Sequence, residues 1–188
     1  GFDLSNMTVI RGETGWIIVD PLTTIEAART AMALVREKLG ERPVVAVIYT
    51  HSHADHFGGA PGIISADDAA AGRVQVIAPE GFMHHAVSEN VIAGPAMVRR
   101  AAYMFGTLLP WADDGHVSSG LGMGRTPGQI GLIPPTSSIT RTGETRRIDG
   151  VDFVFQLTPE TEAPAEMNFY LPQLKALCMA ENANGAMH

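Results

Sequence analysis

The chain has 188 residues, 45% of them hydrophobic and 18% charged, and its twenty acidic and thirteen basic side chains give a net charge of −7. This length suits one large domain with a sizeable core, and the composition excludes a disordered or collagen-like chain. The negative charge has the wrong sign for a protein that grips nucleic acid or an anionic membrane by its overall field, so we expect neither partner.

The single cysteine, Cys178, limits the chemistry of any metal site. It excludes an internal disulfide and a cysteine-rich zinc finger, so a metal site must use histidines and carboxylates. No stretch reaches the roughly 18 apolar residues that cross a bilayer, and no leader peptide is visible at Gly1. Because the chain also opens without an initiator Met and stops abruptly at His188, we expect a piece of a longer protein that does not itself span a membrane.

The first half of the chain predicts a strand, helix, strand order. Residues 7–10 and 15–20 are two short β-rich runs that predict a hairpin. Apolar residues at helical spacing follow from Ile25, with Thr23 as the expected N-cap and Gly40 as the stop. The apolar, β-branched run 44–50 is typical of a strand covered on both faces, and this order predicts parallel pairing.

The rest of the chain is predicted to mix helices and strands around one long connection. Residues 111–148 are rich in Gly, Ser, Thr and Pro and predict an irregular, functional or mobile segment. The other expected elements are a short helix within 57–73, a strand over 74–78, helices over 81–92 and 95–109, and strands over 151–157, 168–171 and 176–180.

Directly after the apolar run 44–50 comes the strongest functional signal, a cluster of four candidate metal ligands. His51 and His53 are two residues apart, so in an extended backbone they point the same way and can share one ion. Asp55 and His56 follow as the chain turns and can face a second ion about 3.5–4 Å from the first. A solvated histidine-rich loop is a poor explanation, because a buried strand precedes the cluster.

This cluster is the HxHxDH signature and resembles that of the metallo-β-lactamase superfamily. The resemblance covers most of the chain, since residues 15–20 and 44–50 also resemble the opening of that family. It implies an α/β fold, namely an αββα sandwich with a dinuclear zinc site at one edge of its two sheets. It also implies hydrolysis of an ester, amide or thioester by a metal-activated water.

The second half departs from the general pattern of that superfamily. Where most members have a ligand histidine, this chain has the carboxylates Glu160, Glu162 and Glu166, and Glu181 stands where a bridging Asp is usual. The combination resembles the alkylsulfatase branch. In that branch Glu162 best matches the terminal ligand of the first zinc, with Glu160 and then Glu166 as alternatives, and Glu181 matches the bridging carboxylate.

The resemblance implies a complete set of roles for these residues. Asp55 and Glu181 are the implied catalytic residues. The implied ligands are His51, His53 and Glu162 for the first of two Zn²⁺ ions, Asp55 and His56 for the second, and Glu181 for both.

The resemblance also implies that residues 1–188 are a catalytic domain truncated on its C-terminal side. Dimerisation and sterol-carrier-like domains, a further histidine ligand and a sulfate-binding arginine are expected downstream, and His188 is expected to be an ordinary position. The fragment is therefore expected to hold one zinc well and the other poorly, with weakened or no activity.

The implied activity is zinc-dependent hydrolysis of a small alkyl sulfate ester to an alcohol and inorganic sulfate. Because the chain is acidic, metal charge would have to recruit the anion. The resemblance further implies a homodimer at full length and a periplasmic or secreted location. The alternatives are another hydrolase of this fold, acting on a lactam, lactone or thioester, and an inactive metal-binding fragment.

Several other residues have two open interpretations. Asp20 either supports a ligand histidine from behind or caps the turn before Pro21. Residues 95–109 either form one wall of an alkyl channel or pack in the core. Arg125 or Arg141 could contact a substrate sulfate.

Overall fold

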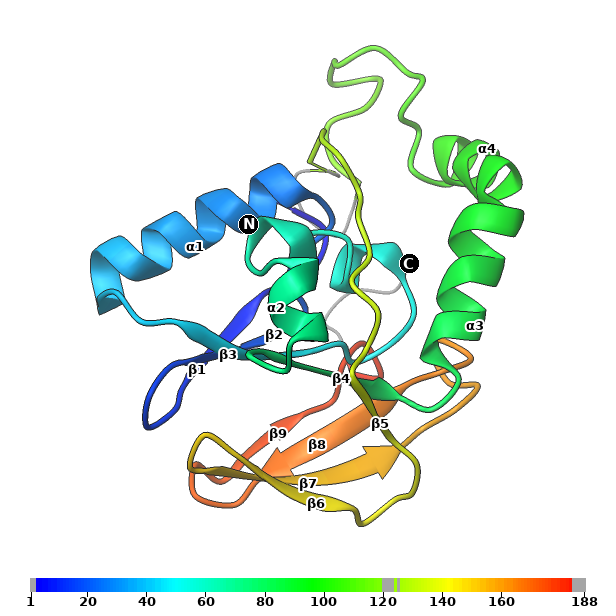
Figure 1. Cartoon of the computed structure of the whole chain (residues 1–188). Coiled ribbons are helices and arrows are strands. Elements are labelled where there is room, and N and C mark those ends of the chain that lie inside the picture. The colour runs from blue at the N-terminus through cyan, green and yellow to red at the C-terminus, as the bar shows by residue number, and fades with distance from the viewer. Residues whose placement is uncertain (1–2, 120–123, 125, 184–188) are drawn as a thin grey trace.

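The structure is a computed structural model, and it describes residues 3–119, 124 and 126–183. Two β-sheets are stacked, and the helices lie on the face of the first sheet that is turned away from the second sheet (Figure 1). In order across the first sheet, the strands are β1 (Thr8–Arg11), β2 (Trp16–Val19), β3 (Val44–Ile48), β4 (Gln75–Pro79) and β5 (Ser137–Ile139). Those of the second sheet are β6 (Thr145–Ile148), β7 (Val151–Leu157), β8 (Met167–Leu171) and β9 (Ala176–Cys178).

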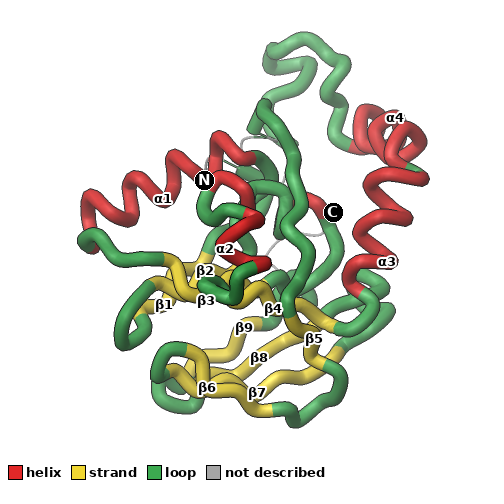
Figure 2. The backbone as a smooth tube through the Cα atoms, viewed as in Figure 1, coloured by secondary structure: helices red, strands yellow, loops and turns green. Residues whose placement is uncertain are grey.

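The predicted strand, helix, strand order is confirmed. Strands β1 and β2 form an antiparallel hairpin, and β2 pairs in parallel with β3. The intervening helix α1 (Ile25–Leu39) covers the outer face of this sheet, as Figure 2 shows. Strands β4 and β5 continue the parallel pairing, so the carboxyl ends of β2, β3 and β4 meet at one edge of the sheet.

The predicted N-cap of α1 is one residue too early. The hydroxyl of Thr24 accepts the cap hydrogen bond from the N–H of Ala27. Thr23 instead donates its N–H and its hydroxyl to the carboxylate of Asp3, at 2.9 Å each. Because a buried carboxylate needs donors, the N-terminal segment takes Thr23 away from the helix end. Gly40 ends the helix as predicted, in the left-handed region at φ 98°.

Two apolar layers hold the sheets together. One lies between the helices and the first sheet and contains the packed rings of Tyr49, Phe57 and Phe82. The other lies between the two sheets and contains Phe153, Phe155 and Phe169. The first sheet is therefore covered on both faces, and this explains the nearly continuous apolar sequence of β3.

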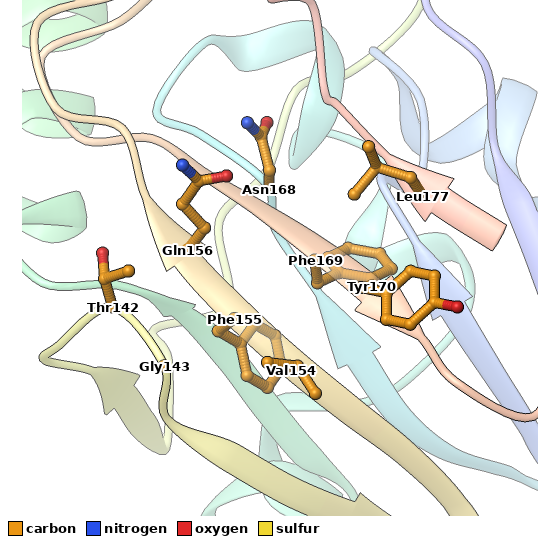
Figure 3. A pocket seen from close by; sticks show the side chains of 9 residues that line it. All are labelled: Thr142, Gly143, Val154, Phe155, Gln156, Asn168, Phe169, Tyr170 and Leu177. Atoms are coloured by element: carbon orange, nitrogen blue, oxygen red, sulfur yellow. The ribbon is translucent and has the colours of Figure 1, made fainter. Parts of the chain in front are cut away.

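The second sheet is covered on one face only by the described residues. Its outer face carries a shallow hollow whose lining includes Val154, Tyr170 and Leu177 (Figure 3). The mixed α/β class is confirmed, and the described part of the chain supplies three layers of the αββα arrangement.

The helices in the middle of the chain differ in part from prediction. They are α2 (Ala66–Ala70), α3 (Phe82–Val87) and α4 (Gly94–Met104), with the 3-10 turns η1 (Ala54–His56) and η2 (Ala60–Gly62) and the π-helix η3 (Ser88–Ile92). The last predicted helix, 95–109, ends instead at Met104. We call residues 82–104 the helical arm.

The predicted irregular segment 111–148 contains two strands that the sequence did not reveal, β5 and β6. Both are short, and each is defined by its neighbour in a sheet rather than by its own pattern. Strand β9 ends at Cys178, two residues before the predicted end, because the chain turns through Ala180 in the left-handed region at φ 48°. Within the described residues, no helix is long and apolar enough to cross a membrane.

Candidate metal centre

The site lies where the carboxyl end of β3 meets the second sheet. Two residues after Tyr49, His51 forms an isolated antiparallel bridge with Glu166, and the N–H of Met167 donates to the carbonyl of Thr50. Asp55 and His56 follow in the turn η1. The carboxyl end of β3 is therefore joined directly to the segment that leads into β8. Side chains from both sheets can converge at this point.

All six predicted ligands are brought together. His53 Nδ1 lies 3.3 Å from Glu162 Oε1. His56 Nε2 lies 3.4 Å from carboxylate oxygens of both Asp55 and Glu181. His51 Nε2 is 3.8 Å from Glu181, and the rings of His51 and His56 are 4.0 Å apart between centroids.

The candidate ligand atoms form two groups that share one carboxylate. His51, His56 and Glu181 offer atoms within 4.8 Å of one another, and so do His53, Glu162 and Glu181. The resemblance placed His51 with His53, whereas this geometry places it with His56. In both arrangements Glu181 is common to the two groups, and this is the position that a bridging carboxylate requires.

Two buried ring nitrogens show that the cluster fits a divalent metal. In the described part of the chain, Nε2 of His51 and Nε2 of His56 make no hydrogen bond and have only the longer ion-pair contacts with carboxylates given above, although both side chains are almost fully buried. An unpaired buried polar atom costs about 1–3 kcal/mol. Because imidazole nitrogen and carboxylate oxygen are the ligands that zinc accepts, an ion between these residues would pair both nitrogens.

Asp20 determines which nitrogen carries the proton on two of these histidines. Its carboxylate accepts hydrogen bonds from the Thr50 N–H at 2.8 Å, the Thr50 hydroxyl at 2.7 Å and His56 Nδ1 at 2.8 Å. Since the Thr50 hydroxyl donates its one proton to Asp20, it must accept from Nδ1 of His51, 2.9 Å away. In both histidines Nε2 therefore faces the other candidate ligands, and Asp20 supports the two rings from behind.

The buried charges give the two histidines different protonation states. Burial, which is the largest cause, and the neighbouring His56 together lower the pKa of His51 to about 3, so His51 is neutral. Burial opposes protonation of His56 as well, but the carboxylates of Asp20, Asp55 and Glu181 outweigh it and raise its pKa well above 6.5. A cation that binds here must therefore displace a proton from His56.

The loop between β7 and β8 distinguishes the three candidate glutamates. Glu162 faces His53, while Glu160 is exposed in a turn at φ 60°. Glu166 is buried, and its carboxylate accepts from the Thr161 hydroxyl at 3.0 Å and the Ala163 N–H at 2.9 Å. Glu162 is thus the glutamate presented to the histidines, and Glu166 holds the loop that presents it.

Glu181 reaches the cluster from the end of β9. The next residue, Asn182, donates its side-chain N–H groups to Thr158 Oγ1 and Asn168 Oδ1, both at 3.2 Å. These bonds tie the turn that carries Glu181 to β8 and to the end of β7.

Several residues of this network are not marked by any sequence pattern that indicates metal binding. Thr50 directly precedes the first ligand, and that adjacency was an available signal. Ser5 donates its hydroxyl to the carbonyl of Asp55 and holds the ligand loop from the N-terminal side. Glu89 and Asn90, in η3, lie against His53 and Ser52, and their helical pattern carried no signal of this contact.

The other candidates that the structure describes have no part in the cluster. Arg125 and His188 lie outside the described residues, and among those described Arg141 makes no hydrogen bond or ion pair with the six candidate ligands. Cys178 packs against the core between the sheets, and burial raises its thiol pKa to about 11. The hollow of Figure 3 is lined by none of the six.

The interpretation of residues 95–109 as core packing is wrong. No residue of α4 is buried. Three of its large apolar side chains, Val98, Tyr103 and Met104, are exposed. The interpretation as one wall of an alkyl channel stays a prediction.

Comparison with known proteins points to one family. The model of the metallo-beta-lactamase superfamily matches residues 1–144. The whole chain is 49% identical to a linear primary-alkylsulfatase from Pseudomonas sp and 50% identical to the alkyl/aryl-sulfatase BDS1 from Saccharomyces cerevisiae. It spans only 28% and 29% of the lengths of these two relatives.

The solved structures agree. The stereoselective inverting sec-alkylsulfatase Pisa1 from Pseudomonas sp. superposes with a TM-score of 0.90 at 48% identity, over 94% of this chain and 28% of that one. A metallo-beta-lactamase family protein from Thermus thermophilus has a TM-score of 0.56 at 22% identity, over 92% of this chain and 52% of that one. The second match supports the fold alone.

Proposed function

Because this chain belongs to the metallo-β-lactamase superfamily, we propose that it forms the metal-binding part of a zinc-dependent alkylsulfatase. The reaction is hydrolysis of a small alkyl sulfate ester to an alcohol and inorganic sulfate. The observation that carries the proposal is the pair of ligand groups that share Glu181, with Glu162 in place of the usual histidine. Its support from relatives is the identity of about half of all positions to alkylsulfatases.

Two metal ions would be held by residues that the fold already brings together. The proposed ligands are His51, His53, Asp55, His56, Glu162 and Glu181. When bound, zinc supplies a water-derived nucleophile at neutral pH and the positive charge that attracts a sulfate ester to an acidic protein. Glu181 would connect the two ligand groups, because its carboxylate lies close to the other residues of each group.

The surrounding residues hold protons at defined atoms. Asp20 keeps a proton on Nδ1 of His56 directly, and on Nδ1 of His51 through the Thr50 hydroxyl. Burial opposes ionisation of Asp55, but hydrogen bonding and the charge of His56 outweigh it and lower the pKa of that carboxyl. Asp55 is therefore an anion that can bind a cation or accept a proton, and it is no proton donor near neutral pH.

Sulfate release tests the proposal, using the protein at the length that its gene encodes. Dodecyl sulfate and a secondary alkyl sulfate are supplied with and without a chelator, and zinc is then restored. We expect sulfate release that the chelator abolishes and zinc restores. Turnover of a lactam or lactone without any sulfate release would contradict the proposal.

Metal content is a second test that needs no substrate. We expect close to two zinc ions per chain in the protein at the length that its gene encodes, and fewer in residues 1–188 alone. A value of one in the full-length protein would contradict a dinuclear site, and a value near zero would refute the metal centre.

A further inference from the structure

The three histidines of the centre differ in the partner of the ring nitrogen that points away from the other candidate ligands. A histidine ligand binds through one ring nitrogen, and the partner of its other nitrogen fixes the ring orientation and the tautomer. For His51 and His56 the outer nitrogen is Nδ1, and its partners, Thr50 and Asp20, belong to the first sheet and its edge. His53 is turned the other way, because its Nδ1 lies 3.3 Å from Glu162. Its outer nitrogen is therefore Nε2.

The group behind Nε2 of His53 belongs to the helical arm. Glu89 Oε1 lies 3.7 Å from that nitrogen, which is ion-pair distance and slightly longer than a hydrogen bond. The two side chains are 23% and 26% exposed, so the pair lies at the rim of the centre rather than in open solvent. A carboxylate at this place can accept the proton on Nε2 and leave Nδ1 free for a metal.

A neighbouring contact keeps Glu89 at this position. The side chain of Asn90 donates to the carbonyl of Ala86 at 2.9 Å and to the carbonyl of Ser52 at 3.4 Å. Ser52 directly precedes His53, so the arm is tied to the ligand loop next to the residue that Glu89 faces. The segment that carries both contacts is the π-helix η3, a wide helical turn that is rare and frequently found at functional sites.

We propose that Glu89 is a positioning residue for His53, and that through it the helical arm helps to set the geometry of the metal centre. This inference rests on the proposed metal centre but not on the sulfatase reaction. It assigns to the arm a role in holding the metal, in addition to any role in binding substrate.

Zinc affinity, measured by competition with a chelator, tests this role in three variants. Glu89→Ala removes the acceptor, Glu89→Gln keeps an acceptor oxygen without the charge, and Glu80→Gln removes an exposed carboxylate just before α3 as the control. We expect affinity to fall about tenfold in Glu89→Ala, at the lower end of the range for partners of a ligand histidine. Glu89→Gln should recover most of this loss, and Glu80→Gln should match the wild type.

Two further measurements separate positioning from a general structural effect. The absorption spectrum of the Co²⁺-loaded protein should change in Glu89→Ala and return towards the wild-type spectrum in Glu89→Gln. The thermal midpoint of the metal-free protein should be the same in all variants.

Unchanged zinc affinity and an unchanged Co²⁺ spectrum in Glu89→Ala would overturn the inference. A fall in affinity that is matched by loss of metal-free stability, and that Gln does not rescue, would also overturn it. Failure of the wild type to bind zinc would instead refute the proposed metal centre itself.

Discussion

The two sides of the metal centre are built differently. On the side of the sheets, Asp20, Thr50 and His51 are buried and joined by hydrogen bonds of 2.7 to 2.9 Å. On the side of the helical arm, His53 and Glu89 are about a quarter exposed and 3.7 Å apart. Hydrogen bonds are electrostatically stronger in the low dielectric of a protein interior. The sheet side is therefore preorganised, while the arm side can adjust.

The packing of the arm agrees with this contrast. Its first helix is anchored through Phe82 and Ala86, which are part of the core beneath the helices. Its last helix, α4, buries no side chain. Segments with few buried contacts open at low free energy, so the arm should be the less stable wall of the site.

The largest effect should come from removing a ligand on the sheet side. His51→Ala deletes a buried ring nitrogen that faces the other candidate ligands, so we expect one zinc ion to be lost on dialysis. Metal analysis of the dialysed protein measures this, and His84→Ala, an exposed histidine of α3, is the control. Unchanged zinc content in His51→Ala would refute the ligand assignment.

The next largest loss of zinc affinity should come from replacing the glutamate that serves as a ligand. Glu162→Gln weakens a ligand directly, so we expect zinc affinity to fall on the order of 100-fold, at the top of the range seen for outer partners. Glu160→Gln should remain within about twofold, because the Glu160 side chain is exposed. The reverse ranking would move the ligand to Glu160.

Asp20 tests whether the sheet side is as rigid as its hydrogen bonds indicate. Asp20→Ala leaves the Thr50 and His56 donors without an acceptor, so we expect a loss of about 2–4 kcal/mol in the free energy of unfolding. Zinc affinity should also fall about 10–100-fold.

Asp20→Asn is the matched variant. Asn tolerates the left-handed backbone of this position, at φ 53°, and keeps one acceptor oxygen. It should recover much of the stability but less of the zinc affinity, because its NH₂ group cannot accept from His56. Urea unfolding measures the stability, and chelator competition measures the zinc affinity. Equal recovery of the two quantities would mean that Asp20 acts through folding alone.

Glu166 supports Glu162 indirectly, so its effect should be smaller. Glu166→Ala removes the acceptor of the Ala163 N–H and the Thr161 hydroxyl, and we expect a loss of about 1–3 kcal/mol in the free energy of unfolding. Glu166→Gln retains an acceptor oxygen and should cost less. If Glu166→Ala lowered zinc affinity more than Glu162→Gln does, Glu166 would be the ligand.

The smallest effect should come from the exposed surface of the arm. Tyr103→Ser changes an 86% exposed side chain of α4, so we expect the free energy of unfolding to stay within about 0.5 kcal/mol. Zinc affinity should be unchanged. A clear loss of stability or of zinc affinity would show that Tyr103 makes a stabilising contact. The arm would then not be the less tightly packed side of the centre.

Local patterns predicted the hairpin, α1 and the central strand well, because each depends on spacing within a few residues. The same logic missed β5 and β6, which are short edge strands that exist through pairing with β4 and β7. It also placed the helix cap at Thr23, since nothing near that residue shows that Asp3 binds it. Apolar helical spacing in 95–109 predicted burial or a channel wall, yet spacing alone does not supply a packing partner.

The sequence by itself determined that this protein has a metal-binding loop at a strand end, because His51, His53, Asp55 and His56 are neighbours in the chain. Only the tertiary structure showed which carboxylates lie close to these residues and which side chains lie behind the histidines. Glu162, Glu181, Asp20 and Glu89 reach the loop from other strands and from the arm. The physical reason is that ligand identity is a local property, whereas ligand geometry requires the two sheets to meet at one edge.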